Sequence, residues 1–147
     1  MATTLDCTMS VPPSLKVGEP VQLRFQLTNP TAQPLFVLNW NTPLEGLFNN
    51  YLQVTRNGTD IPYRGPMFKR GAPEADAYVS VPAGKSVEAS VEVSLAYDFT
   101  QPGHYRLAFR NELLDVTPNQ AEVPHPLERF QPMTVKCPAV ETTIVSP

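Results

Sequence analysis

The sequence predicts an all-β fold: an immunoglobulin-like antiparallel β-sandwich of about seven to nine strands, with little or no helix. Proline supplies 17 of the 147 residues, well above the usual ~5%, and proline breaks helix interiors. Several stretches alternate apolar and polar residues with a period of two, which is typical of strands that bury one face. Turn-forming residues separate these stretches at short intervals, as they do in sandwiches.

Three stretches alternate most clearly. Their apolar residues, which we expect to face the core, are Val21, Leu23, Phe25 and Leu27, then Val87, Ala89, Val91, Val93 and Leu95, and then Tyr105, Leu107 and Phe109. Most residues between them are polar or charged, so each stretch has one apolar face and one wet face. The pattern predicts strands at residues 21–28, 87–95 and 105–109.

The other predicted strands are shorter. Residues 35–40 are almost continuously apolar and predict a central strand. Residues 51–56 end in Asn57-Gly58, a strong hairpin signal because both residues tolerate positive φ, so a return strand is expected at 60–63. Further strands are predicted at 77–81, 134–137 and 141–145, with a turn at 82–85 and room for a short helix at 44–51 or 111–116.

A turn followed by glycine and tyrosine precedes the strand at 105–109. Gly103 lies two residues before Tyr105, an arrangement that resembles the tyrosine corner of immunoglobulin-like sandwiches, in which the tyrosine hydroxyl bonds to upstream backbone. Asp98 is expected to accept hydrogen bonds from turn amides rather than to act as an acid or base. We therefore assign structural roles to Tyr105, Gly103 and Asp98.

The two cysteines, Cys7 and Cys137, stand near opposite ends of the sequence. Two cysteines at this separation make no zinc motif. They are interpreted as structural, either as two buried free thiols or as a disulfide between the first and last strands. A disulfide would require an oxidising compartment. The sequence leaves both alternatives open.

Composition and charge exclude several classes of protein. The net charge is −3 and there is no basic patch, so a nucleic-acid partner is not expected. No apolar run approaches the ~20 residues of a membrane span, and no signal peptide is recognised at the N-terminus. We expect a cytoplasmic protein if the chain is complete as given, and a periplasmic or secreted protein if a leader was removed.

Catalytic motifs are absent from the sequence. It has no HExxH, GxSxG, Walker or GxGxxG pattern. Its two histidines are given structural roles, His104 as an exposed residue of the corner turn and His125 as a loop residue. We expect no enzymatic activity, no bound metal and no cofactor.

One long stretch without alternation is the candidate site. Residues 62–76 carry glycines and prolines around six apolar and basic residues, which are Tyr63, Arg64, Met67, Phe68, Lys69 and Arg70. Structureless loops of this length are uncommon and often functional. The segment is either a partner-binding edge or a self-packed crossover between the two sheets. The whole chain, 1–147, is predicted to be a single domain, with a less regular proline-rich segment at 111–132.

Several short motifs follow one another between residues 15 and 109. They are Trp40-Asn41-Thr42-Pro43-Leu44-Glu45-Gly46-Leu47, Val54-Thr55-Arg56-Asn57-Gly58, Tyr63-Arg64-Gly65, Lys69-Arg70, Val81-Pro82-Ala83-Gly84-Lys85-Ser86, Leu95-Ala96-Tyr97-Asp98-Phe99 and Gly103-His104-Tyr105. In this order they resemble the N-terminal prodomain of bacterial deuterolysin-like (aspzincin, peptidyl-Lys) metalloendopeptidases. The catalytic half of that family has no counterpart here, so its catalytic roles transfer to no residue of this chain.

The resemblance implies a protease inhibitor or propeptide-like domain. In that family the N-terminal domain keeps the protease inactive, and the zinc belongs to the protease. The expected partner is therefore a zinc metalloendopeptidase of the aspzincin type, whose active-site cleft an extended loop would block. Because that group accepts lysine after the scissile bond, Lys69 is a candidate substrate-like side chain. The alternatives are that Lys69 and Arg70 make surface salt bridges, or that the tail at 111–147 lies in the cleft.

Two other functions remain open on the residues alone. The chain could be an interaction or adhesion module with no protease partner. A carbohydrate-binding sandwich that uses Trp40 is less favoured, because a lone tryptophan on a central strand is more often part of the core.

Overall fold

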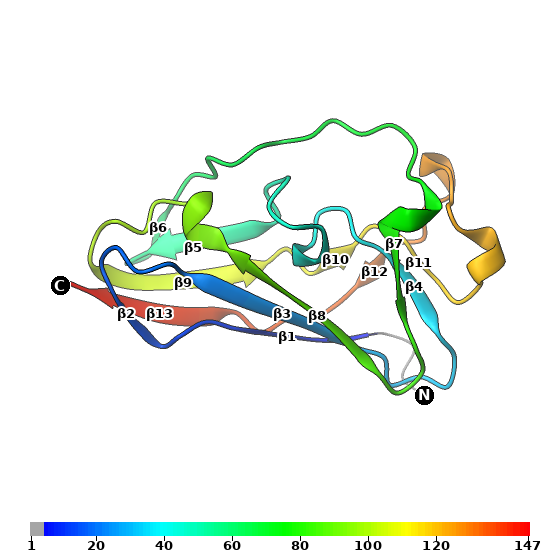
Figure 1. Cartoon of the computed structure of the whole chain (residues 1–147), viewed down its shortest axis with the longest axis horizontal. Helices are drawn as coiled ribbons and strands as arrows, with labels where there is room; N and C mark the ends of the chain where they lie inside the picture. The colour runs from blue at the N-terminus through cyan, green and yellow to red at the C-terminus, as the bar shows by residue number, and fades with distance from the viewer. Residues whose placement is uncertain (1–4) are drawn as a thin grey trace.

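The computed structural model describes residues 5–147 as an all-β chain. Its strands are β1 (Asp6–Ser10), β2 (Ser14–Lys16), β3 (Gln22–Thr28), β4 (Leu35–Leu38), β5 (Leu52–Arg56), β6 (Thr59–Asp60), β7 (Tyr78–Val81), β8 (Ser86–Glu92), β9 (Gly103–Phe109), β10 (Glu112–Leu113), β11 (Val116–Thr117), β12 (Met133–Thr134) and β13 (Val140–Val145). The helices are single 3-10 turns: η1 (Pro43–Glu45), η2 (Ala75–Ala77), η3 (Val93–Leu95), η4 (Gln120–Glu122) and η5 (Leu127–Arg129). The predicted fold class is confirmed (Figure 1).

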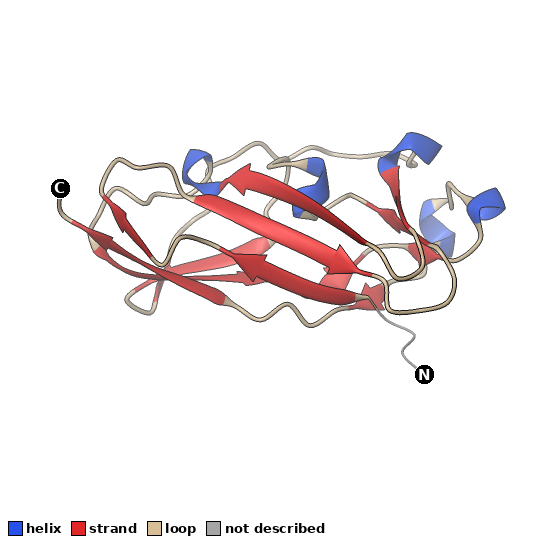
Figure 2. Cartoon of the chain, turned by 60° about the horizontal axis from the view of Figure 1, so that its bottom comes forward, coloured by secondary structure: helices blue, strands red, loops and turns tan. Residues whose placement is uncertain are grey.

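Two sheets make the main layers of the sandwich. The first has the order β1-β3-β8 and the second the order β2-β13-β9-β5-β6. Every pair in them is antiparallel except β2 with β13. Figure 2 shows the three strands of the first sheet crossing in front of the second. Two smaller sheets, β11-β4-β7 and β10-β12, complete the structure.

The core lies between the two layers and follows the predicted alternation. On β3 and the residue before it, Val21, Leu23, Phe25 and Leu27 are fully buried. From the opposite layer the Phe109 ring reaches Phe25, with 5.3 Å between the ring centroids. Period-two patterning therefore places one face of each central strand against the other sheet.

The predicted hairpin turns are present. Asn57 and Gly58 have φ values of 50° and 84°, as a two-residue hairpin between β5 and β6 requires. The turn at 82–85 closes with a 3.0 Å hydrogen bond from the Lys85 amide to the Pro82 carbonyl. Glycine suits this turn because Gly84 has φ 71°, a conformation that side chains with a Cβ rarely adopt.

The strand predicted at 87–95 is too long. β8 ends at Glu92, and η3 turns the chain because the amides of Ala96 and Tyr97 both donate to the Val93 carbonyl. Val93 stays in the core, but Leu95, predicted to face the core, is 75% exposed. The hydrogen bonds of the turn override the continuing apolar alternation.

Other boundaries also differ from the prediction. At 134–137 the strand β12 covers only Met133–Thr134. The stretch 111–116 holds two short strands, β10 and β11, rather than a helix, and the short helix of 44–51 is the single turn η1. Among the described residues no helix has the length and apolar character needed to cross a membrane.

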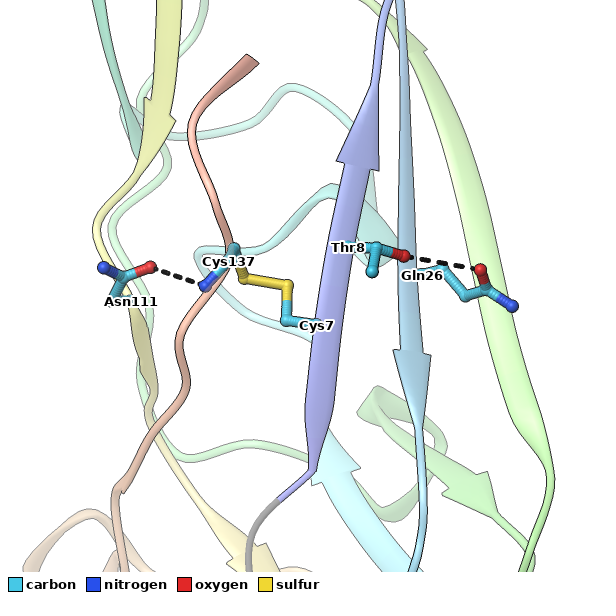
Figure 3. The surroundings of a disulfide bond; sticks show 5 residues. All are labelled: Cys7, Thr8, Gln26, Asn111 and Cys137. Carbon is cyan, nitrogen blue, oxygen red and sulfur yellow. Dashed lines mark hydrogen bonds between the residues drawn. A yellow bond between two sulfur atoms is a disulfide. The ribbon is translucent and has the colours of Figure 1, made fainter.

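A disulfide joins Cys7 of β1 to Cys137, which precedes β13 (Figure 3). Their Cα atoms are 4.7 Å apart and both residues are buried. The Cys137 amide donates to the Asn111 side-chain oxygen at 3.2 Å, which fixes the backbone at this point. Of the two alternatives open for the cysteines, the structure therefore has the disulfide and not the pair of free thiols.

The turn before β9 has the hydrogen bond of a tyrosine corner. The buried Tyr105 donates its hydroxyl to the Gln101 carbonyl at 2.6 Å. Asp98 accepts the Thr100 amide at 2.9 Å. Gly103 lies so close to Arg56 that a Cβ would meet the Arg56 Nε at 2.9 Å.

Candidate functional site

Residues 62–76, here called the strap, connect β6 to β7 through η2. The strap runs along the length of the molecule outside the strands (Figure 1). All six candidate residues of the sequence analysis lie on it. Two attachments hold it to the rest of the protein on either side of an exposed stretch, and a backbone hydrogen bond from Phe68 within that stretch adds a third contact.

The first attachment holds the beginning of the strap against η3 and the turn after it. The Arg64 amide donates to the Ala96 carbonyl at 2.7 Å, and the Tyr63 ring packs against Tyr97 with centroids 5.5 Å apart. The Tyr63 hydroxyl donates to the Pro66 carbonyl at 2.5 Å. Burial raises the pKa of Tyr63 above its ordinary value. Tyr63 is therefore half-buried and bonded within the protein, with little left to offer a partner.

The second attachment is built on Arg70. Its guanidinium pairs with the Glu45 carboxylate and lies over the Trp40 ring, 4.9 Å from the centroid. The Glu45 side chain is only 5% exposed and also accepts the Asn41 amide at 2.6 Å. Burial raises the pKa of Glu45, while the Asn41 amide and Arg70 act in the opposite direction. The Arg70 side chain is thus an anchor within the protein, and its contact with a partner stays a prediction.

Three of the six candidate side chains are exposed between the two attachments. Met67 is 68% exposed and Phe68 is 54% exposed, and Lys69 is also exposed. Within residues 5–147 Lys69 takes part in no ion pair, whereas Arg70 pairs with the nearly buried Glu45 rather than in a surface salt bridge. The remaining strap cation, Arg64, is exposed and lies 3.8 Å from the Asp98 carboxylate.

Phe48, which sequence patterns did not single out, joins this group. The Phe68 amide donates to the Phe48 carbonyl at 3.1 Å, and the two rings stack with centroids 4.9 Å apart. Phe48 is 38% exposed. Because 20 residues separate the two rings in the chain, no local motif could have linked them.

A second cluster, also missed, lies under the proline-rich segment. Asp115 is fully buried and accepts hydrogen bonds from His125 Nδ1 at 2.8 Å, from the Tyr78 hydroxyl at 2.5 Å and from the Gln131 amide at 2.8 Å. The hydrogen bond to Asp115 is the largest factor that raises the pKa of His125. Burial, followed by the bond to Asp115, raises the pKa of Tyr78 to about 12. His125 is thus a loop residue, as predicted, but a buried one that ties its loop to the sheets.

The remaining candidates have structural surroundings. His104 is exposed, with Nε2 3.1 Å from a Glu141 oxygen. Trp40 is buried beneath Arg70, so its ring face is not free to stack on a sugar. In the described part of the chain no three His, Cys, Asp or Glu side chains come together as a metal site would need.

Comparisons with known proteins give one significant likeness in sequence. The chain is 34% identical over 90 residues, or 60% of its length, to an extracellular protease of Aeromonas hydrophila. It spans only about a quarter of that protein. No protein-family model matches the sequence. Among solved structures, the CARDB domain of a Pyrococcus furiosus protein overlaps 97% of the chain with a TM-score of 0.40 and 14% identity.

These observations establish a β-sandwich, part of which is similar in sequence to part of an extracellular protease. The similarity is coarser than the family resemblance found in the motifs, since it names neither the zinc nor the lysine specificity.

Proposed function

We propose that this chain is a non-catalytic inhibitor or propeptide-like domain that blocks the active-site cleft of an extracellular zinc metalloendopeptidase of the aspzincin type. The observation that carries the proposal is the 34% identity over 90 residues to an extracellular protease of which the chain spans a quarter. A partial match of this kind is what an accessory domain of a larger protease would give. The disulfide agrees with an oxidising compartment, periplasmic or extracellular.

The strap supplies the geometry that such a mechanism needs. An inhibitory loop binds more tightly when it is already ordered, because binding then costs less conformational entropy. Both ends of the exposed stretch are held, by Arg64 and Tyr63 on one side and by Arg70 on the other. Between them Lys69 extends without a carboxylate partner in the described chain, as a substrate-like side chain would.

The test is inhibition of the purified mature protease of Aeromonas hydrophila by the full chain. The substrate is a fluorogenic peptide with lysine after the cleaved bond. The proposal predicts that protease activity falls as the concentration of folded chain rises. A chain that was first unfolded by reductant and heat should leave the activity unchanged. Full activity in molar excess of folded chain, with no complex on gel filtration, would sink the proposal and leave a β-sandwich interaction or adhesion module.

Lys69 has a matched control in Lys85. Both are exposed and neither is in an ion pair within residues 5–147. If Lys69 occupies the specificity pocket, Lys69→Ala weakens inhibition and Lys85→Ala does not. If both variants inhibit as strongly as the wild-type chain, Lys69 has no part in the mechanism, and the tail at 111–147 becomes the candidate.

A further inference from the structure

We infer that Phe48, Met67 and Phe68 form one contact surface, here called the aromatic ridge, which packs on an apolar protein surface that carries a carboxylate beside Lys69. The inference rests on the proposed function and specifies how the partner protease is recognised. It adds Phe48 to the partner-binding residues and makes Arg70 a positioning residue.

The ridge holds three of the six large apolar side chains that are exposed in the described chain. The exposed large apolar residues of the described chain are Phe48, Met67, Phe68, Leu95, Leu127 and Val145. Of these, Phe48 and Phe68 come together through the stack of their rings, and the exposed Met67 directly precedes Phe68 in the chain. Single exposed apolar residues are ordinary on protein surfaces, whereas a cluster of them marks an interaction site. Aromatic residues and methionine are also enriched in interfaces.

The ridge is held in place by the backbone rather than by its own packing. The hydrogen bond from the Phe68 amide to the Phe48 carbonyl joins the strap to the loop after η1. Two residues further along, Arg70 is fixed by Glu45 of η1 and by Trp40. The strap and the loop after η1 are thus both held against η1. The two rings therefore keep their relative position without a partner. An ordered aromatic pair loses little side-chain entropy on binding.

Charge at the ridge points to the chemistry of the partner surface. Of the three strap cations, Arg70 is neutralised by Glu45, and Arg64 lies near Asp98. Lys69 alone has no carboxylate within ion-pair distance among residues 5–147. A partner that covers Phe68 would have to accommodate the neighbouring ammonium, and a carboxylate satisfies it best.

The same charge disfavours a second copy of this chain as the occupant. A two-fold dimer places the same patch of both subunits face to face. Two ridges packed in this way would place both Lys69 ammonium groups in or beside one interface, although neither has a carboxylate within ion-pair distance among residues 5–147. A protease surface with an acidic group carries no such penalty.

The experiment measures the dissociation constant of the full chain and the Aeromonas hydrophila protease by calorimetry. Phe48→Ala combined with Phe68→Ala is expected to weaken binding by at least about tenfold, as truncation of interface anchors does. Met67→Glu, which changes a side chain that is 68% exposed, is expected to weaken binding similarly. Leu127→Ala is the matched control because Leu127 is comparably exposed at 50% and lies outside the ridge. Thermal melting verifies that each variant is folded.

The outcomes separate this inference from the proposed function. One outcome is that the wild-type chain inhibits the protease while Met67→Glu and the double variant bind it with unchanged affinity. That result overturns the ridge but leaves the inhibitor proposal intact. No binding by the wild-type chain overturns both. Concentration-dependent dimerisation that the double variant abolishes would make a second copy the occupant and overturn the partner assigned here.

Discussion

Arg70 lies over the ring of Trp40, 4.9 Å from its centroid, while its guanidinium pairs with the nearly buried carboxylate of Glu45. The tryptophan ring and the carboxylate hold one guanidinium from two directions. Guanidinium suits this position because it is planar, remains charged and stacks on aromatic rings. This anchor sets where the strap returns to the body of the protein.

Removal of the Glu45 charge should therefore destabilise the protein. Glu45→Gln leaves Arg70 half-buried without its counter-ion, which is expected to lower the free energy of unfolding by about 1–3 kcal/mol. Urea denaturation measures this change. Glu88→Gln is the control, since Glu88 pairs with Arg24 on the exposed face of β3 and β8, where such pairs contribute under about 1 kcal/mol. Equal losses for both variants would contradict the anchor.

The cluster at Asp115 predicts a pH dependence of stability. The pKa of His125 is raised by its hydrogen bond to Asp115 and by the nearby charge. The stabilisation from protonated His125 is then complete below its unfolded pKa of about 6.5 and is lost as pH rises through the higher folded pKa. The free energy of unfolding of the wild-type chain should exceed that of His125→Gln most at acidic pH, and the difference should shrink above neutrality.

Urea titrations at a series of pH values measure this difference. His104→Gln is the control because it leaves the His125–Asp115 pair intact. The difference in free energy of unfolding between His104→Gln and His125→Gln should therefore also shrink as pH rises. A difference between wild type and His125→Gln that grows with pH would show that His125 is bound in its neutral form.

The disulfide should supply a large part of the stability. It closes a loop over a sequence separation of 130 residues. Loss of a native disulfide commonly costs about 2–5 kcal/mol, and the entropic contribution increases with loop length. The double variant Cys7→Ala, Cys137→Ala should unfold at lower urea and be indifferent to reductant. Reduction should lower the urea midpoint of the wild-type protein to that of the variant. An unchanged midpoint after reduction would contradict the expected contribution of the disulfide to stability.

Two glycines of the strap test its first attachment. A Cβ at Gly65 would lie 2.5 Å from the Tyr63 hydroxyl oxygen and 2.7 Å from the adjoining ring carbon, whereas a Cβ at Gly71 would meet nothing within 4 Å. Gly65→Ala should displace the Tyr63 ring and break its bond to Pro66, at a cost of about 1 kcal/mol. Gly71→Ala should be neutral or slightly stabilising. Chemical denaturation of both variants decides, and an identical result for the two would mean that Tyr63 moves freely.

Sequence patterns predicted the central strands because period two and full burial coincide there, as at Leu23 and Phe25. They failed at Leu95, where the Val93 carbonyl accepts two amides and the chain turns although its apolar alternation continues. The candidate partner-binding surface was only partly visible in the sequence. The exposed strap residues follow from composition, but the partners of Phe68 and Arg70 are 20 and 25 residues away, and such pairings are set by tertiary packing.

The cluster of Asp115, Tyr78 and His125 illustrates the same limit. Tyr78 and Asp115 are 37 residues apart, and each is unremarkable in its own segment. Burial of the carboxylate, which gives the cluster its importance, depends on the packing of two sheets and a proline-rich loop. No local periodicity encodes it.

The bond between Cys7 and Cys137 bears on the proposed contact between the exposed strap and a protease. A cut at any single peptide bond between the two cysteines, the strap included, leaves both fragments covalently joined. The nicked chain would run as one species on a non-reducing gel and as two after reduction. Cleavage of the strap would therefore not release its halves from each other, and the core that positions them would stay assembled around the break.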